Sequence, residues 1–545
     1  MNARRPSDLL SRLMPAFFIA AVSGLAQWRY SAFGFNPTDD GFVLACARRV
    51  LGGQIPHLDF TAIHLAGSCY LHAPFVAFGG DHIYLISRYF VWVQLAFIAW
   101  SWTGISARVL EVELSPSIRI CVGLTGFALS AHYFPVMAWH TIDGLFLLTA
   151  GFAICVADRG AARFVGYGLM GAAILCKQNF LFCPPLIVLL FEQRQRGLAA
   201  LAVLAAPMIY ALIVVLSGGA GDAWLQLTTQ GDMITPGFLK YLWEPAYAAG
   251  AVIGLLMAIL LKAPSQHGDA PVLSLCGLAV VALLLAEAGF AMTAGRYIGA
   301  PAFGLFGLAC GTTLGLAADP ARNRAHWRLG LVAVAAAWCT ALSIGYNTPA
   351  LAAGLSATVL LALYFATSAS PRAIRSSASA IVVGLTLLCL WNFDKARLKY
   401  VYLERPASEL VWRLDGILPG GRGLLVDRNT YLVMRDLQAA IAEAGKPYTI
   451  QPDFAGWWAA ADQGNPLPVD WPQWIELGSP RLRDRAIGAM NAQRGRLSII
   501  VAKYETALIA RKLTPSPTSF RYPLAAYART HFTKIGETQY FEIYR

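Results

Sequence analysis

Residues 36–60 read NPTDDGFVLACARRVLGGQIPHLDF and place two adjacent carboxylates, Asp39 and Asp40, directly after the first long apolar run of the chain. A second long apolar run begins near residue 83, so the charged stretch lies in a loop between two segments long enough to cross a membrane. The fold of the chain follows from this alternation of apolar runs and polar loops.

The composition is that of a membrane protein with one water-soluble part. Of the 545 residues, 57% are hydrophobic and 14% are charged, whereas about 25% are charged in an ordinary soluble protein. Residues 1–394 contain 39 charged side chains, and the much shorter stretch 395–545 contains 35. We therefore expect a mainly α fold: a polytopic helix bundle over residues 1–394, followed by a small soluble α/β domain over residues 395–545.

Thirteen apolar segments are candidate membrane spans, and an odd number puts the two termini on opposite sides of the membrane. If the N-terminus lies inside, fifteen Lys and Arg residues fall in or beside the cytoplasmic segments and five fall in the outer ones. The first loop, residues 34–82, and the C-terminal domain are therefore expected outside. The thirteen segments are 12–33, 83–107, 119–138, 141–157, 163–176, 180–191, 197–217, 245–262, 272–292, 297–318, 328–346, 349–368 and 377–393.

Charge and cysteine usage narrow the function classes. The net charge is +12, but the basic residues form no single stripe, so membrane lipids rather than nucleic acid are the expected anionic partner. All ten cysteines precede residue 390. Cys46 and Cys69 share the first loop and could pair in an oxidising compartment, but we prefer to interpret them as small buried hydrophobic residues.

The first loop is predicted to contain two helices that lie on the membrane surface. From Asp39 to Gly52 the apolar residues recur at helical spacing, with Thr38 or Asp39 as the cap and Gly52-Gly53 as the end. A second helix is expected within residues 61–79. An isolated Asp-Asp pair is more often a cap and a solvated first-turn residue than a catalytic group.

Several predicted spans have further polar side chains at their outer ends. Ionisable groups at this depth in a membrane cost free energy and usually face a polar cavity. These side chains are Asp59, His140, Asp143, Lys177, Gln178, Glu287 and Arg296.

Three motifs carry a resemblance to a known family. The sequence TDDGFVLACARRVLGGQIPHLDF (38–60), with GAAILCKQNF (171–180) and GRYIGAPAFGL (295–305), resembles the GT-C superfamily of integral-membrane glycosyltransferases. The most similar branch is that of the protein O-mannosyltransferases and the lipid A aminoarabinose transferases. The resemblance covers about the first 300 residues. It departs from the branch at Asp40, where many relatives have Glu, and at His57, where Tyr is usual.

The resemblance implies an enzyme of a bacterial inner (cytoplasmic) membrane that moves a sugar from a polyprenyl phosphate to a hydroxyl group outside, with inversion expected. The acceptor would be an envelope glycolipid or polysaccharide rather than a protein. Asp39 would be the general base and Asp40 would orient it or the acceptor. The implied acceptor- and sugar-binding residues are His57, Asp59, His140 and Asp143, and the implied donor-phosphate-binding residues are Lys177, Gln178, Arg296 and Tyr297.

Alternatives stay open for several of these residues. Lys177 and Arg296 could be interfacial anchors, and a structural role is preferred for His64, His72 and His140. Two aspartates could hold a divalent cation, but no metal or other cofactor is expected to be required.

In the C-terminal domain, strands are predicted over residues 423–427, 448–452 and 496–504, with helices over 431–445 and 505–513. A hairpin is predicted across Gly536-Glu537. The Trp-rich stretch 456–474 could contact sugar or membrane, or could simply be packed. Two rival functions are a transporter or flippase of a lipid-linked saccharide and an O-antigen ligase or polymerase; no internal repeat supports the transporter.

Overall fold

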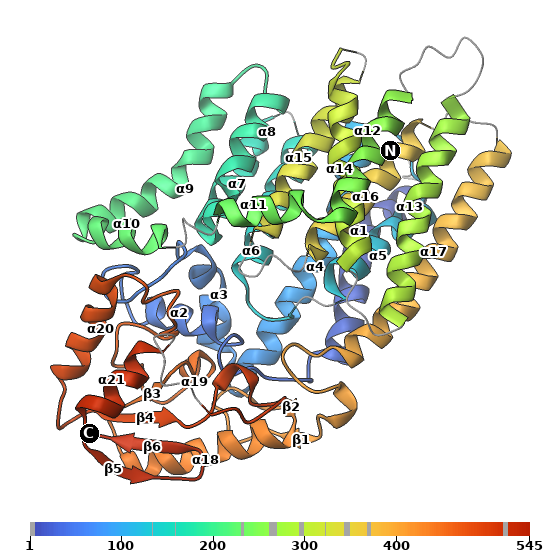
Figure 1. Ribbon diagram of the computed structural model, residues 1–545. Coiled ribbons are helices and arrows are strands. Elements are labelled where there is room, and N and C mark those ends of the chain that lie inside the picture. The colour runs from blue at the N-terminus through green and yellow to red at the C-terminus, as the bar shows by residue number, and fades with distance from the viewer. Residues whose placement is uncertain are drawn as a thin grey trace.

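The computed structural model shows a helix bundle with a sheet-containing domain at one end (Figure 1). Helix α1 begins at the end of the bundle farthest from that domain, and two short helices of the first loop lie between the bundle and the domain. The structure describes residues 6–132, 135–158, 160–229, 234–260, 270–293, 299–321, 323–342, 349–367, 372–515 and 522–545.

Each of the thirteen predicted spans overlaps a helix of the bundle, and the sixth also overlaps the end of the 3-10 turn η2 (Gln178–Phe182). The helices are α1 (Pro6–Tyr30), α4 (Ile83–Val109), α5 (Pro116–Ala131), α6 (His140–Ala157), α7 (Ala162–Cys176), α8 (Cys183–Phe191), α9 (Arg196–Leu216), α12 (Pro245–Leu260), α13 (Ala270–Thr293), α14 (Gly299–Ala317), α15 (Arg324–Ala341), α16 (Ala350–Thr367) and α17 (Arg372–Lys399). Two further helices, α10 (Ala220–Thr228) and α11 (Ile234–Leu242), lie between α9 and α12.

The number of spans is not confirmed as thirteen. Within the described residues, five helices are long and apolar enough to cross a membrane, or six if the bent pair α11–α12 counts as one span. Helices such as α5, α7 and α16 are apolar but contain fewer than the roughly 20 residues that a straight crossing needs. The chain is therefore a multi-pass membrane protein whose predicted short segments are helical but not of full spanning length.

The C-terminal region contains a four-stranded sheet in the order β3-β4-β6-β5 and a two-stranded sheet of β1 and β2. Strands β3 and β4 are parallel, and the other neighbours are antiparallel. The strands are β1 (Trp412–Arg413), β2 (Leu425–Val426), β3 (Tyr448–Gln451), β4 (Ser498–Ala502), β5 (Lys534–Glu537) and β6 (Phe541–Tyr544). The helices are α18 (Arg428–Ala444), α19 (Ala455–Trp458), α20 (Pro480–Asn491) and α21 (Pro523–His531).

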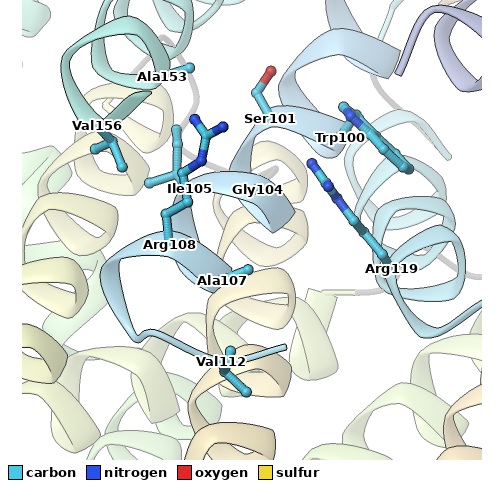
Figure 2. A pocket seen from close by; sticks show the side chains of 10 residues that line it. All are labelled: Trp100, Ser101, Gly104, Ile105, Ala107, Arg108, Val112, Arg119, Ala153 and Val156. Carbon is cyan, nitrogen blue, oxygen red and sulfur yellow. The ribbon is translucent and has the colours of Figure 1, made fainter. Parts of the chain in front are cut away.

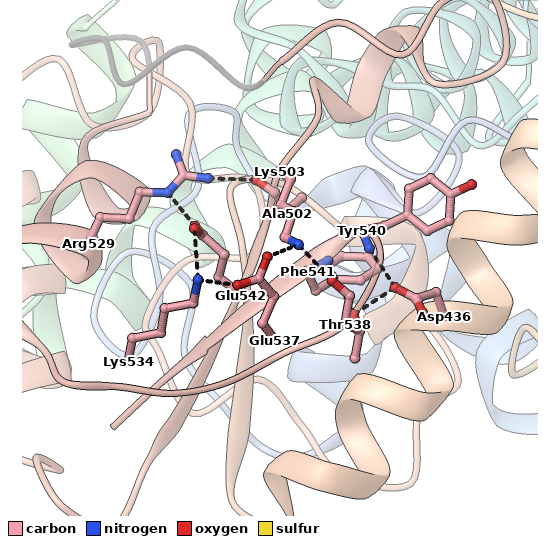
Figure 3. A network of polar contacts seen from close by, with 10 residues as sticks. All are labelled: Asp436, Ala502, Lys503, Arg529, Lys534, Glu537, Thr538, Tyr540, Phe541 and Glu542. Carbon is pink, nitrogen blue, oxygen red and sulfur yellow. Dashed lines mark hydrogen bonds and ion pairs between the residues drawn. The ribbon is translucent and has the colours of Figure 1, made fainter.

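Two predicted elements of this region are wrong in detail. The stretch 505–513 contains only a 3-10 turn, Thr506–Leu508, rather than a helix. The hairpin turns after Glu537, not across Gly536-Glu537. The physical reason is a polar network around the turn (Figure 3), in which Asp436 of α18 accepts hydrogen bonds from the Thr538 hydroxyl at 2.6 Å and the Tyr540 N–H at 2.8 Å.

The neighbouring Glu537 closes this network from the other side of the turn. It pairs with Lys503 and Lys534, and these two ammonium groups lower the pKa of its carboxyl to about 2. Charged and polar contacts thus set the register of the hairpin, and a pattern of hydrophobic residues does not predict such contacts.

The first loop contains two helices, α2 (Phe42–Leu51) and α3 (Gly67–Phe78), which pack against each other. A disulfide joins Cys46 of α2 to Cys69 of α3, so the interpretation of these residues as unpaired small hydrophobics is wrong. Helix α2 begins at Phe42 and no side chain caps it, so the predicted cap is also wrong. The two aspartates are therefore free for other contacts.

Candidate functional site

The adjacent carboxylates of the first loop point to different partners. Asp40 is buried and forms an ion pair with Arg88 of α4, with 2.8 Å between Oδ1 and Nη2. Its other oxygen accepts a hydrogen bond from the Asn36 N–H at 2.8 Å. Arg88 also donates to the backbone carbonyls of Ser31 and Gly34. Asp40 therefore fixes the start of the loop on the bundle.

Asp39 has no cationic partner in the described part of the chain. It is 8% exposed, and its Oδ2 accepts a hydrogen bond from the Tyr402 hydroxyl at 2.8 Å. Burial raises the pKa of the Asp39 carboxyl to about 6, the Tyr402 hydrogen bond opposes this rise, and the charge of Asp40 adds to it. The Trp471 indole also lies beside Asp39 and favours its charged form. A carboxyl with a pKa near neutral pH is suited to accept and release a proton.

The C-terminal domain covers this part of the first loop. The Gly456 N–H of α19 donates to the Pro37 carbonyl at 2.8 Å, and the Tyr84 hydroxyl of α4 donates to the Gly456 carbonyl. A Cβ atom at Gly41 would lie 2.3 Å from the Gly456 Cα, so only glycine permits this approach. Asp39 and Asp40 are thus followed directly in the sequence by Gly41, whose backbone packs against the backbone of the C-terminal domain.

A buried ion pair fixes α2 to the same domain. Arg49 of α2 binds both carboxylate oxygens of Asp470, at 2.5 and 2.7 Å. It also donates to the Leu467 carbonyl at 2.7 Å. Such a bidentate contact fixes orientation as well as distance.

A second acid of the domain lies next to Asp39. Asp453 accepts hydrogen bonds from Gln473 and Thr506. Burial, with a further contribution from the charge of Asp39, raises the pKa of Asp453 to about 7. Asp39 and Asp453 are therefore two neighbouring buried carboxyl groups with raised pKa values, one from the loop and one from the domain.

Lys177 lies between α7 and η2 and is 5% exposed. Its Nζ donates to the Thr141 hydroxyl at 3.0 Å, and within the described residues no carboxylate lies close enough for an ion pair with it. A buried ammonium group without an anionic neighbour is costly, and an anionic ligand would relieve that cost.

Two histidines lie close to this ammonium group. The rings of His64 and His140 are 4.5 Å apart, and His64 Nδ1 donates to the Gln178 side-chain oxygen at 2.8 Å. Burial, and secondarily the charge of Lys177, lowers the pKa of His64 to about 4, so this imidazole is neutral at pH 7. Among the described residues, neither nitrogen of His140 has a hydrogen-bond partner.

A small cavity of about 30 Å³ lies beside the two histidines. Its lining includes Phe42, His64, His140, Trp471 and Glu476. The Phe42 ring lies 5.4 Å from that of His140 and 5.1 Å from that of Trp471. Asp39 lies beside the Trp471 wall, and Lys177 lies close to the two histidines.

The other predicted site residues lie elsewhere or have other partners. Asp143 is buried and accepts hydrogen bonds from His72 at 3.0 Å and Gln94 at 2.7 Å. His57 is held by Gln226 and Tyr210, each at 2.9 Å. Asp59 is exposed and accepts a hydrogen bond from the Ile55 N–H. Arg296 and Tyr297 lie outside the described residues.

Sequence reasoning missed Tyr402, Asp453, Trp471 and Glu476, which belong to the C-terminal domain. The only signal for any of them was the Trp-rich stretch, which left sugar contact and packing equally open. Arg88 was also missed, because a single arginine within an apolar helix has no motif. In the described part of the chain, no group of three or more His, Cys, Asp or Glu side chains is arranged to hold a metal ion. That the protein requires no metal ion stays a prediction.

Comparison with known proteins gives one similar structure. No family model matches the chain, and no curated protein matches it. The chain is similar to the crystal structure of ArnT from Cupriavidus metallidurans in the apo state, with 11% sequence identity and a TM-score of 0.45, over 99% of this chain and 98% of that one. ArnT belongs to the aminoarabinose transferase branch that the sequence motifs resemble.

Proposed function

We propose that this protein is a GT-C-type glycosyltransferase that moves a sugar from a polyprenyl-phosphate donor to a hydroxyl group of an envelope glycolipid or polysaccharide. The observation that carries the proposal is a pair of buried groups near the small cavity, Asp39 beside Trp471 and Lys177 close to His64 and His140. One is a buried carboxyl with a raised pKa, Asp39. The other is a buried ammonium group, Lys177, with only a neutral hydrogen-bond partner in the described residues.

The two groups suit the two ends of a glycosyl transfer. The acceptor oxygen bonds to the anomeric carbon of the sugar and passes its proton to Asp39, while the bond from that carbon to the phosphate oxygen breaks. The leaving polyprenyl phosphate gains negative charge, which the Lys177 ammonium stabilises. A single displacement of this kind inverts the anomeric centre. Tyr402 and Asp40 position Asp39 and the loop that carries it.

The remaining predicted roles are part of the same proposal. Gln178 stands beside Lys177 and, with Arg296 and Tyr297, is assigned to the donor phosphate. His140 lines the cavity and is assigned to the sugar. His57, Asp59 and Asp143 are assigned to the acceptor, and each has a hydrogen-bond partner within the protein.

We further propose that the site faces outward from a bacterial inner membrane, with the N-terminus inside. The Cys46–Cys69 disulfide supports this orientation, because disulfides persist in oxidising compartments and are rare in the cytosol. The cysteines lie in the loop that the positive-inside rule puts outside.

Co-purified lipid tests the proposed function. Native mass spectrometry of the wild-type protein should show bound polyprenyl phosphate or a polyprenyl-linked sugar. Lys177→Ala should lower the bound fraction at least tenfold, because the buried cation that meets the phosphate is gone. Lys399→Ala, which removes an exposed lysine at the end of α17, is the matched control and should retain the lipid. Equal retention in both variants would mean that Lys177 does not bind the donor.

The pH dependence of transfer tests the role of Asp39. A general base acts in its charged form, so the rate should rise with pH through about 6 and then level off. Tyr402→Phe removes a hydrogen bond that lowers the pKa of Asp39, so its rising limb should move to higher pH. A limb that stays in place in Tyr402→Phe argues that another group titrates.

A further inference from the structure

A second cavity lies at the other end of the bundle, far from the candidate site. Its volume is about 300 Å³, and it opens between the ends of α4 and α6 and the start of α5 (Figure 2). The polar part of the lining comes from Arg108, Arg119 and Ser101, and the apolar part includes Trp100, Val112 and Val156. Figure 2 shows the two guanidinium groups on either side of Gly104.

The guanidinium group of Arg119 is held in place by two contacts and fills a space beside Gly104. It lies 4.4 Å from the centre of a Trp100 ring, and its Nε donates to the Thr103 hydroxyl at 3.4 Å. A Cβ atom at Gly104 would lie 2.7 Å from an Nη atom of Arg119, so the glycine leaves the space that the guanidinium fills. The contacts fix one face of the group and its Nε, and leave its Nη donors for a ligand.

Within the described residues, no acid forms an ion pair with either of these cations, although Glu111 and Glu113 lie in the loop between them. No carboxylate lines the cavity. At the same end of the bundle, by contrast, Arg163 pairs with Glu192 at 3.3 Å. Two neighbouring cations without a paired acid form a site of positive potential, which favours an anion.

The depth of the cavity indicates the kind of anion. Helix α4 begins at Ile83, which packs in the core of the C-terminal domain, and ends beside Arg108. At about 1.5 Å per residue, its 27 residues extend about 40 Å, close to the thickness of a bilayer with its headgroups. The cavity thus lies at the level of the lipid headgroups on the face opposite the candidate site.

We propose that this cavity binds the phosphate of an anionic phospholipid headgroup. The arginine forks would contact the phosphate oxygens, with the Ser101 hydroxyl as a third donor, and Val112 and Val156 would contact the apolar part of the lipid. Basic pockets between membrane helices bind anionic lipid headgroups in this way. The proposal does not depend on the proposed glycosyl transfer.

The test uses purified full-length protein in neutral detergent, to which phosphatidylglycerol, phosphatidylcholine or inorganic phosphate is added. Phosphatidylglycerol should raise the thermal midpoint of the wild type, and native mass spectrometry should show it bound. Arg108→Ala and Arg119→Ala should each weaken this binding about tenfold. Arg194→Ala, which removes an exposed arginine elsewhere on the same face, is the matched control and should bind normally.

Arg108→Ala carries the test alone if Arg119→Ala does not fold, because Arg108 is exposed. Gly104→Leu should block the cavity without changing any charge. Equal loss of binding in Arg108→Ala and Arg194→Ala would overturn the proposal in favour of diffuse surface charge. An equal effect of inorganic phosphate would overturn the lipid assignment, and equal binding of phosphatidylcholine would overturn the role of the anion.

Discussion

Asp39→Asn should lower glycosyl transfer by roughly a hundredfold or more and at the same time stabilise the protein. The amide keeps the shape of the side chain and can still accept the Tyr402 hydrogen bond, but it cannot take a proton from the acceptor. The stabilisation follows from the pKa. Burial holds the carboxyl of the folded protein at a pKa of about 6, above the value of about 4 expected in the unfolded chain.

The sign of the pH effect follows from this difference. Below about pH 4 the carboxyl is neutral in both states and costs nothing; between about pH 4 and 6 the unfolded state loses its proton first, and stability falls as the pH rises. At pH 8 the buried charge costs up to about 3 kcal/mol, which the amide avoids. The thermal midpoint of Asp39→Asn in detergent should therefore exceed that of the wild type at pH 8 and match it at pH 4.

Two variants serve as references for this experiment. Asp40→Asn should lower the thermal midpoint, because it leaves the buried Arg88 guanidinium without its ion pair. Asp81→Asn changes an exposed carboxylate of the same loop and should leave both transfer and stability near normal. Near-normal glycosyl transfer by a folded Asp39→Asn variant would show that Asp39 is not the general base.

Gly41→Ala should separate the C-terminal domain from the first loop. The new methyl group would lie 2.3 Å from the Gly456 Cα and 2.4 Å from the Ala455 carbonyl oxygen, both backbone atoms that cannot rotate away. We expect a loss of about 1–3 kcal/mol of stability from this overpacking. We also expect at least a tenfold loss of transfer, because the domain would carry Tyr402 and Trp471 away from Asp39.

The matched control is Gly488→Ala on α20 of the same domain, where a Cβ atom meets nothing within 4 Å. That change should stabilise the helix by up to about 1 kcal/mol and leave transfer unchanged. Hydrogen exchange at α2 and α19 reports the contact directly: it should quicken in Gly41→Ala only. Unaltered exchange there would show that the backbones can adjust without separation.

The sequence predicts the helices far better than their number of crossings. Apolar length identifies segments such as α6 and α9 closely. It also gives the bounds of α7 closely, but it counts α5 and α7 as crossings although both helices are shorter than a full span. In the C-terminal region, period-2 and period-3.6 patterns predict β3, β4 and α18, whereas the hairpin turn depends on Asp436, which is remote in sequence.

The candidate site shows the same division. The Asp39-Asp40 pair is visible in the sequence, but its neighbouring residues do not show that the two carboxylates have different roles. Arg88 pairs with Asp40 and Tyr402 donates to Asp39, and both partners are remote in sequence. The sequence does not predict the Cys46–Cys69 disulfide for a related reason. Composition favours buried single cysteines, and only the packing of α2 on α3 brings these two together.

The contact between Gly41 and Gly456 also has a consequence for biogenesis. The ribosome makes the first loop roughly 400 residues before α19, and at about 5–20 residues per second this interval is on the order of half a minute. Throughout it, Asp39 lacks Tyr402 and Trp471, and Arg49 lacks Asp470. A nascent or truncated chain therefore carries its acid in a solvated, more acidic form. If Asp39 is the general base as proposed, such a chain would be inactive until the last quarter of the polypeptide has been made.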